Sequence, residues 1–147
     1  MMNPPCASSM LYISYWEFFQ HYYKPRLQEL DMLLKSIDSP ISASEAATAL
    51  VMKSEEVEKI MTQEKIRLID RNSFLNIMMH GSSPLCQLLQ RECSCGSPDR
   101  YSPAHIAYIY GLQDSHVAEI CQANGYTEVP AHKLPDLLNK IYIFIMQ

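Results

Sequence analysis

The amino-acid sequence predicts an all-α, mainly helical fold, in which an N-terminal helix precedes two tandem three-helix helix-turn-helix units packed into one compact body. Apolar residues recur at spacings of three and four, residues suited to cap a helix precede these runs, and the pattern of one segment returns sixty residues later. The expected parts are an N-terminal helical segment (1–40), a first helix-turn-helix unit (41–80), a connecting helix and loop (81–100), and a second unit (101–147).

Composition narrows the class of protein. The chain has 147 residues, 48% of them hydrophobic and 19% charged, which is enough apolar side chain for a folded core. Its formal net charge of −4 argues against a dominant role in binding phosphate groups. Five cysteines without a secretory signal favour a cytoplasmic protein with reduced thiols, and the apolar run at 141–146 is far shorter than the roughly 20 residues of a membrane span.

The first helix is expected to begin at Ser14, because Ser14 and Glu17 form a capping-box pattern. Pro25 lies inside the apolar stripe that follows, and it should kink the helix or split it in two, since proline lacks a backbone N–H group. The stripe favours packing on the helix's own domain. Its near-heptad spacing leaves a second interpretation open, a homodimer formed through this N-terminal helix.

The first helix-turn-helix unit shows another capping box, from Ser42 to Glu45, and Ser54 is expected to cap its second helix. A short extended piece, "KIRLID", should follow before a third helix. The inward residues expected in this third helix are Phe74, Ile77 and Met78.

The same plan recurs without a gap between residues 101 and 138. Ser42 falls on Ser102, and Ser54 falls on Asp114 as the cap of the second helix. Although few residues are identical, caps, turns and apolar positions agree at one offset, which favours a structural repeat.

The segment between the copies should form a short helix from Ser83 and Pro84 to about Glu92, followed by the loop "CSCGSPD". The apolar stretch from Ile141 to Met146 fits either a continuation of the last helix or a strand that packs on the core.

Both copies resemble the helix-turn-helix of excisionases and MerR-type regulators. The first copy carries the residues of the family's pattern, with Ser54 displaced by one place: Ser42, Glu45, Ala46, Ala47, Leu50, Ser54, Val57 and Ile60. The resemblance covers about 38 residues in each copy, and it implies a DNA-binding transcriptional regulator whose second helix enters the major groove. The basic residues available for this role lie around the turn and the wing position of the first copy: Lys53, Lys59, Lys65, Arg67 and Arg71.

Two departures from the family favour another use. The segment "EKIRLIDRNSF" is too short for a two-stranded wing. The helix expected to read DNA is acidic in the first copy, and its equivalent in the second copy has no Lys or Arg, so phosphates would be repelled. The alternative function is a protein-binding adaptor or antirepressor-like factor on a degenerate helix-turn-helix scaffold. Its expected interface residues are Glu55, Glu56, Tyr108, Tyr110 and His116.

No arrangement of residues favours catalysis or metal binding. Cys86 and Cys93 share a helical face but are separated by about 10 Å of helix rise, too far for one zinc ion unless the helix ends early. Cys93 and Cys95 are close in sequence, yet no paired Cys-x-x-Cys spacing completes a site. We therefore expect a non-enzymatic protein without a cofactor or a metal, whose partner is DNA or another protein and which does not bind a membrane.

Overall fold

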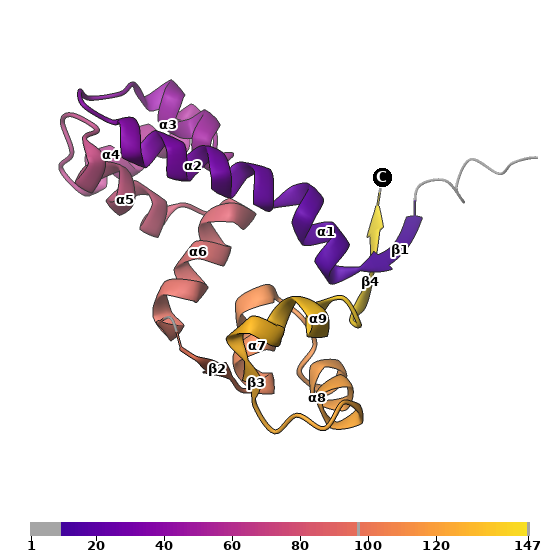
Figure 1. The fold of residues 1–147 in the computed structure, drawn as a ribbon. Helices are drawn as coiled ribbons and strands as arrows, with labels where there is room; N and C mark the ends of the chain where they lie inside the picture. Colours follow the sequence, from indigo (N-terminus) through magenta and orange to yellow (C-terminus); the bar gives the residue numbers. More distant parts are fainter. Residues whose placement is uncertain (1–9, 97, 147) are drawn as a thin grey trace, which may run out of the picture. The chain divides into compact units, whose positions relative to one another are not determined.

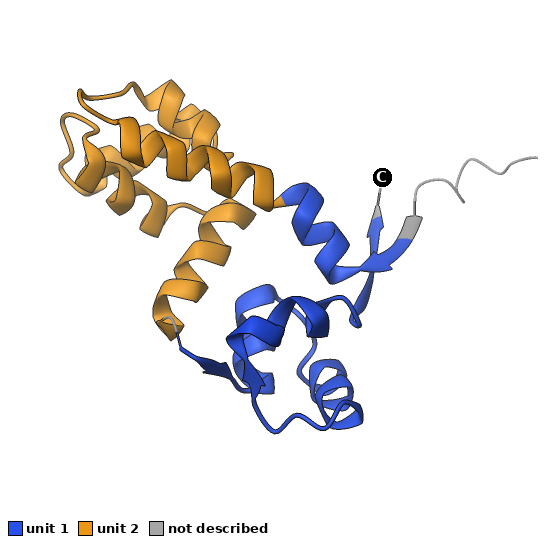
Figure 2. Ribbon diagram, viewed as in Figure 1, with its two compact units in different colours: residues 1–22, 98–147 blue, residues 23–97 orange. Residues whose placement is uncertain are grey.

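The computed structural model describes residues 10–96 and 98–146, and the mainly helical fold predicted from the sequence is confirmed (Figure 1). The chain divides into two compact units (Figure 2). Unit 1 combines Met1–Tyr22 with Pro98–Gln147, and unit 2 is Tyr23–Ser97. The expected N-terminal segment, 1–40, is therefore divided between the two units, and each expected helix-turn-helix copy lies within one of them.

Unit 2 contains the first helix-turn-helix copy and the helix that follows it. Its helices are α2 (Lys24–Ser36), α3 (Ala43–Leu50), α4 (Ser54–Gln63), α5 (Arg71–His80) and α6 (Pro84–Cys95). Each of these helices contributes to the core, which includes Leu30, Leu50, Val57, Phe74, Ile77 and Leu88. A single antiparallel bridge between Ile41 and Ile69 lies where the resemblance would place a wing, so the expected short extended piece amounts to one residue pair.

Unit 1 joins both ends of the described chain. Its elements are β1 (Met10–Ser14), α1 (Tyr15–Tyr22), β2 (Arg100–Tyr101), α7 (Pro103–Tyr110), α8 (Asp114–Ala123), β3 (Val129–Pro130), the 3₁₀ helix η2 (Ala131–Lys133), α9 (Leu134–Leu138) and β4 (Tyr142–Met146). The strands β1 and β4 pair antiparallel from Ser14 opposite Tyr142 to Met10 opposite Met146. Of the two interpretations of the C-terminal apolar stretch, the strand is therefore the observed one.

The expected N-terminal helix is two helices, because α1 ends at Tyr22 and α2 begins at Lys24. Pro25 lies in the first turn of α2, where a backbone N–H group has no partner within the helix and its loss costs little. The expected cap is present, since the Ser14 hydroxyl accepts a hydrogen bond of 3.1 Å from the Glu17 amide. The strand β1 before this cap was not among the expected elements.

The first two helices of the two copies have the same local structure at an offset of sixty residues. Helices α3 and α7 share their bounds at this offset, and so do α4 and α8. The caps Ser42 and Ser102 accept hydrogen bonds from the amides of Glu45 and His105, at 3.0 and 3.1 Å. The bridge from Ile41 to Ile69 corresponds to the pairing of Tyr101 with Val129. The first two helices of each copy and the strand pairing beside them therefore recur at this offset, whereas α5 of the first copy corresponds to η2 and the five-residue α9 of the second.

The expected caps of the second helices are wrong by one residue. Ser54 and Asp114 are the first residues of α4 and α8, and the caps are Lys53 and Gln113. The reason is that the carbonyl groups of Lys53 and Gln113 already accept the first helical hydrogen bonds, from residues 57 and 117 at 3.2 and 3.0 Å.

The connecting helix is longer than expected, since α6 continues to Cys95 and includes the whole "CSC" sequence that was expected to begin the loop. Gly96, with a φ of 71°, ends it instead, and its amide donates to the Cys93 carbonyl at 3.2 Å.

Candidate functional site

In the helix-turn-helix of unit 2, one face of α4 is exposed to solvent. Val57 and Ile60 are buried on the other face, against the core that Ala47 and Leu50 of α3 help to form. A left-handed residue, Val51, makes the turn between the helices, and the Met52 amide donates to the Ala47 carbonyl at 2.8 Å. The exposed residues of α4 are Glu55, Glu58, Lys59, Thr62 and Gln63.

Glu56 does not belong to this exposed face, although the sequence suggested it as an interface residue. Its Oε2 atom accepts two hydrogen bonds of 2.8 Å from Ser82, one from the amide and one from the hydroxyl. The carboxylate therefore joins the first turn of α4 to the segment that leads into α6, and this contact occupies it within the unit.

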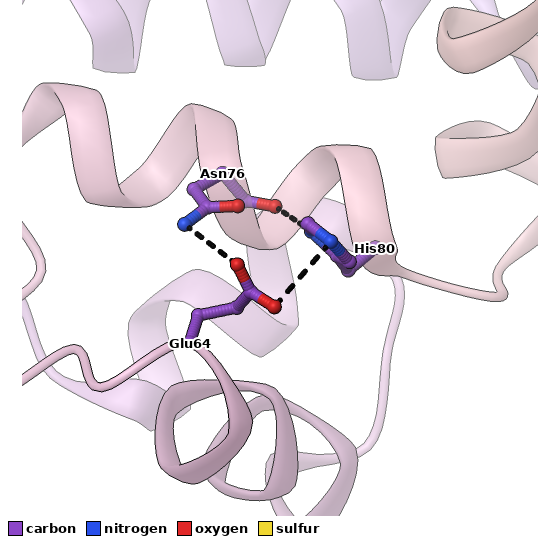
Figure 3. Close-up of polar contacts among 3 residues, drawn as sticks. All are labelled: Glu64, Asn76 and His80. Atoms are coloured by element: carbon purple, nitrogen blue, oxygen red, sulfur yellow. Dashed lines mark hydrogen bonds and ion pairs between the residues drawn. The ribbon is translucent and has the colours of Figure 1, made fainter.

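Glu64, at the end of α4, is also used within unit 2 (Figure 3). Its Oε1 lies 3.4 Å from Nδ2 of Asn76, and its Oε2 lies 3.5 Å from Nε2 of His80. The Nδ1 atom of His80 lies 2.9 Å from the Asn76 carbonyl oxygen. Both ring nitrogens face acceptor atoms, so only the doubly protonated ring donates to both. The cluster fastens the end of α4 to α5.

The five residues expected to bind DNA lie in different surroundings. Lys53, Lys59, Lys65 and Arg67 are exposed. Arg71 is exposed as well, and its Nε donates to the Leu34 carbonyl at 2.8 Å, which joins α5 to the end of α2. Lys53 and Lys65 flank the two ends of α4, with Glu55 and Glu58 between them.

The interface residues expected in the second copy differ in exposure. The side chain of Tyr108 is 53% exposed. Tyr110 packs against the unit's core, with its ring 5.6 Å from that of Tyr15 and 6.0 Å from that of Phe19. His116 is half-buried on α8 and lines a cavity of about 320 Å³ beside β4. Glu55 and Glu56 belong to unit 2 and the other three to unit 1.

Two features of the surface were missed from the sequence. The cavity beside His116 is completed by Leu112, Tyr142 and Phe144, and its β4 wall depends on a strand that the sequence did not settle. A wider groove of about 660 Å³ separates α2 from α3, between Arg26 and Glu29 on one side and Thr48 and Val51 on the other. The spacing along each helix does not indicate either feature, because each is created where elements distant in the sequence pack together.

The cysteines differ in burial. Cys86 and Cys121 are buried, Cys93 is exposed and Cys95 is intermediate, and all four are unpaired; Cys6 lies outside the described residues. Burial raises the pKa of the Cys86 thiol, with the negative charge of Glu56 adding to the effect, and burial also raises the pKa of Cys121. Within residues 10–96 and 98–146, no three His, Cys, Asp or Glu side chains gather as a metal site would require.

No helix in the described part of the chain combines the length and apolar character needed to cross a membrane. Comparison of the chain with protein families, with curated proteins and with solved structures finds no match.

Proposed function

We propose that the chain is a non-enzymatic, cytoplasmic protein-binding factor in which the helix-turn-helix scaffold docks on a basic surface of a partner protein. The observation that carries the proposal is the charge of the exposed face of α4, where Glu55 and Glu58 outnumber Lys59. The equivalent helix α8 exposes Asp114 and Glu119 and has no Lys or Arg. Complementary charge speeds association and rejects partners of the same sign.

The DNA-binding regulator that the excisionase/MerR resemblance implies is the competing function. It would rely on the exposed residues Lys53, Lys59, Lys65, Arg67 and Arg71, although Arg71 also donates from Nε to the Leu34 carbonyl. Glu55 and Glu58 would lie on the same helix face as Lys59 and would repel the phosphates that this lysine attracts. Non-specific DNA affinity arises mainly from phosphate contacts, so this balance of charge favours a protein partner.

A charge-reversal experiment separates the two functions. The whole chain is titrated against fluorescent random-sequence duplex DNA at low and at moderate salt. We expect no binding by the native chain and salt-sensitive binding by the double variant Glu55→Lys, Glu58→Lys. The control is Glu29→Lys, Asp38→Lys, which changes the net charge equally at exposed residues of the same unit outside α4. Salt-sensitive binding by the native chain that Lys65→Glu, Arg67→Glu abolishes would establish DNA binding instead.

The protein partner is sought with a photo-crosslinking amino acid placed at residue 58, and with the same group at residue 38 as the control. We expect a defined cross-linked protein from position 58 alone, which is lost when Glu55 is replaced by Lys. Identical cross-links from both positions would contradict docking through α4.

A further inference from the structure

The paired strands β1 and β4 present aromatic side chains to solvent. Tyr12 is 56% exposed, Tyr142 44% and Phe144 66%, and the ring of Tyr12 lies 5.3 Å from that of Tyr142 and 4.6 Å from that of Phe144. Ile143, on the opposite face, packs against the core of unit 1. An antiparallel sheet with one face on a core ordinarily places polar residues on the other face. Here the solvent side is a continuous aromatic surface, which indicates that another surface covers it.

The outer edge of β4 is also unoccupied by another strand of the described chain, because the sheet consists of β1 and β4 alone there. The Tyr15 amide donates to the carbonyl of Ile141, the residue opposite it. Hydrogen-bonded pairs recur at every second residue of an antiparallel ladder, so Ile13 and Ile143 form the next such pair. Since inward and outward backbone groups alternate along an antiparallel strand, the N–H and C=O groups of Tyr142 and Phe144 point away from β1. Within the described residues, no strand pairs with these backbone groups of Tyr142 and Phe144, the residues whose rings are also exposed.

The sequence of β4 contains none of the features that protect strand edges. Natural proteins place a charged residue, a proline or a bulge on an exposed edge so that it does not pair with another chain. Tyr142–Met146 reads YIFIM, with neither charge nor proline, and β1 (MLYIS) is likewise uncharged. An edge of this kind is suited to pairing with another strand.

We propose that this surface binds a second copy of the chain, with β4 pairing antiparallel to β4 of that copy across a two-fold axis. The pairing would give a four-stranded sheet in the order β1-β4-β4-β1. Such an interface is self-complementary, as two-fold symmetry requires.

Charge argues against the other ligands that stack on aromatic rings. The two segments of unit 1 contain six acidic residues and three basic ones, so nucleic acids and anionic membranes would be repelled. The strands themselves carry no charge, so two copies meet there without placing like charges opposite each other.

The buried area fits a reversible dimer. At their observed exposures, the three rings offer about 300 Å² of surface per copy, given some 200 Å² for each whole side chain. Strand pairing and the flanking residues bring the total for both copies to roughly 1,000 Å², the lower end of specific interfaces. We therefore expect a dissociation constant in the micromolar range rather than an obligate dimer.

Sedimentation equilibrium of the whole chain tests the proposal, from about 1 to 100 µM and in a reductant that prevents disulfide formation through Cys93. We expect a concentration-dependent dimer whose dissociation constant rises at least about tenfold in Phe144→Lys, because lysine on an edge opposes strand pairing. Phe144→Thr, which keeps a strand-forming residue, should weaken the dimer without adding charge. Trp16 fluorescence of each variant reports whether unit 1 remains folded.

Met32→Lys is the matched control, because Met32 is 70% exposed on α2 and its replacement adds the same charge. This variant should leave the dissociation constant of the dimer unchanged. Loss of the dimer in Met32→Lys would place the interface on the N-terminal helices instead. A chain that stays monomeric at every concentration, or a dimer that persists in both folded Phe144 variants, would overturn the proposal. Failure of the α4 charge-reversal experiment leaves this test unaffected, because the substituted residues belong to a different unit.

Discussion

The Ser14 hydroxyl donates a hydrogen bond of 2.8 Å to Oδ1 of Asn139, a residue 125 positions later in the chain. The same hydroxyl accepts from the Glu17 amide, so it both caps α1 and ties the start of this helix to the end of α9. Ser14 is fully buried, and the Tyr15 amide next to it donates to the Ile141 carbonyl. These contacts connect the two segments from which unit 1 is built.

Replacing Ser14 by Ala should destabilise unit 1 by about 2 kcal/mol, because the helix loses its cap and Asn139 loses a partner. Urea denaturation followed by Trp16 fluorescence measures the change, since Trp16 is the one tryptophan of the chain and lies in α1 of unit 1. Ser115→Ala is the control, because this serine is exposed on α8 of the same unit. A loss below about 0.5 kcal/mol would contradict the double role of Ser14.

The sequence predicted the features that are determined within one helical turn. The caps Ser14, Ser42 and Ser102 and the break at Pro25 depend on neighbouring residues, so they are confirmed at the expected positions. The strand β1 could not be found in this way, because its stability comes from pairing with β4, more than a hundred residues later. For the same reason, the sequence did not show that unit 1 combines an N-terminal and a C-terminal segment of the chain.

The sequence predicts the charge of the candidate site, but it does not predict the contacts that two of the site's residues make. The acidic character of α4 follows directly from its sequence, and Glu55 is exposed as expected. Nothing in the sequence pattern indicates that Ser82 donates to the Glu56 carboxylate, or that Arg71 donates to the Leu34 carbonyl. Both contacts join residues at least 26 positions apart, and only the packing of the helices brings them together.

The turn between the two helices of each copy predicts a pair of opposite substitutions. Val51 has a φ of 57° and occupies the left-handed region, where Gly111 stands at the equivalent position of the second copy with a φ of 67°. A β-branched residue is strained there and glycine is not. Val51→Gly should therefore stabilise unit 2 by about 0.5–1 kcal/mol, after allowance for the entropy of glycine in the unfolded chain.

The reverse substitution, Gly111→Val, should destabilise unit 1 by about 1–2 kcal/mol through backbone strain alone, because no atom lies within 4 Å of a Cβ at this position. Trp16 fluorescence follows unit 1, and the rate at which the buried Cys86 thiol is labelled during denaturation follows unit 2. Destabilisation by Val51→Gly would show that the valine side chain contributes more by its contacts than its conformation costs.

Gly81 predicts a steric effect without backbone strain, since its φ is −74°. A Cβ atom there would lie 2.6 Å from Sγ of Cys86 and 2.9 Å from Sδ of Met52. Gly81→Ala should therefore destabilise unit 2 by about 1–3 kcal/mol, as overpacking a core does. Adding Cys86→Ala should recover part of the loss, and the double-mutant cycle measures the coupling by circular dichroism in urea. Strictly additive effects would show that Cys86 is not the obstacle.

Glu92 predicts a pH dependence of unit 2, because burial raises the pKa of its half-buried carboxyl group above the ordinary value of 4.5. A raised pKa means that the folded state holds the proton more tightly than the unfolded state. The protonated Glu92 carboxyl group therefore contributes fully to the free energy of unfolding at pH values below the ordinary pKa. This contribution is lost as the pH rises through the raised pKa of the folded state. Glu92→Gln, which cannot ionise, should stabilise unit 2 at pH 7 and change little at about pH 4. Urea denaturation at both pH values measures this, with Glu58→Gln on the exposed face of α4 as the control. An equal effect of Glu92→Gln at the two pH values would show that the amide acts through packing rather than through the buried charge.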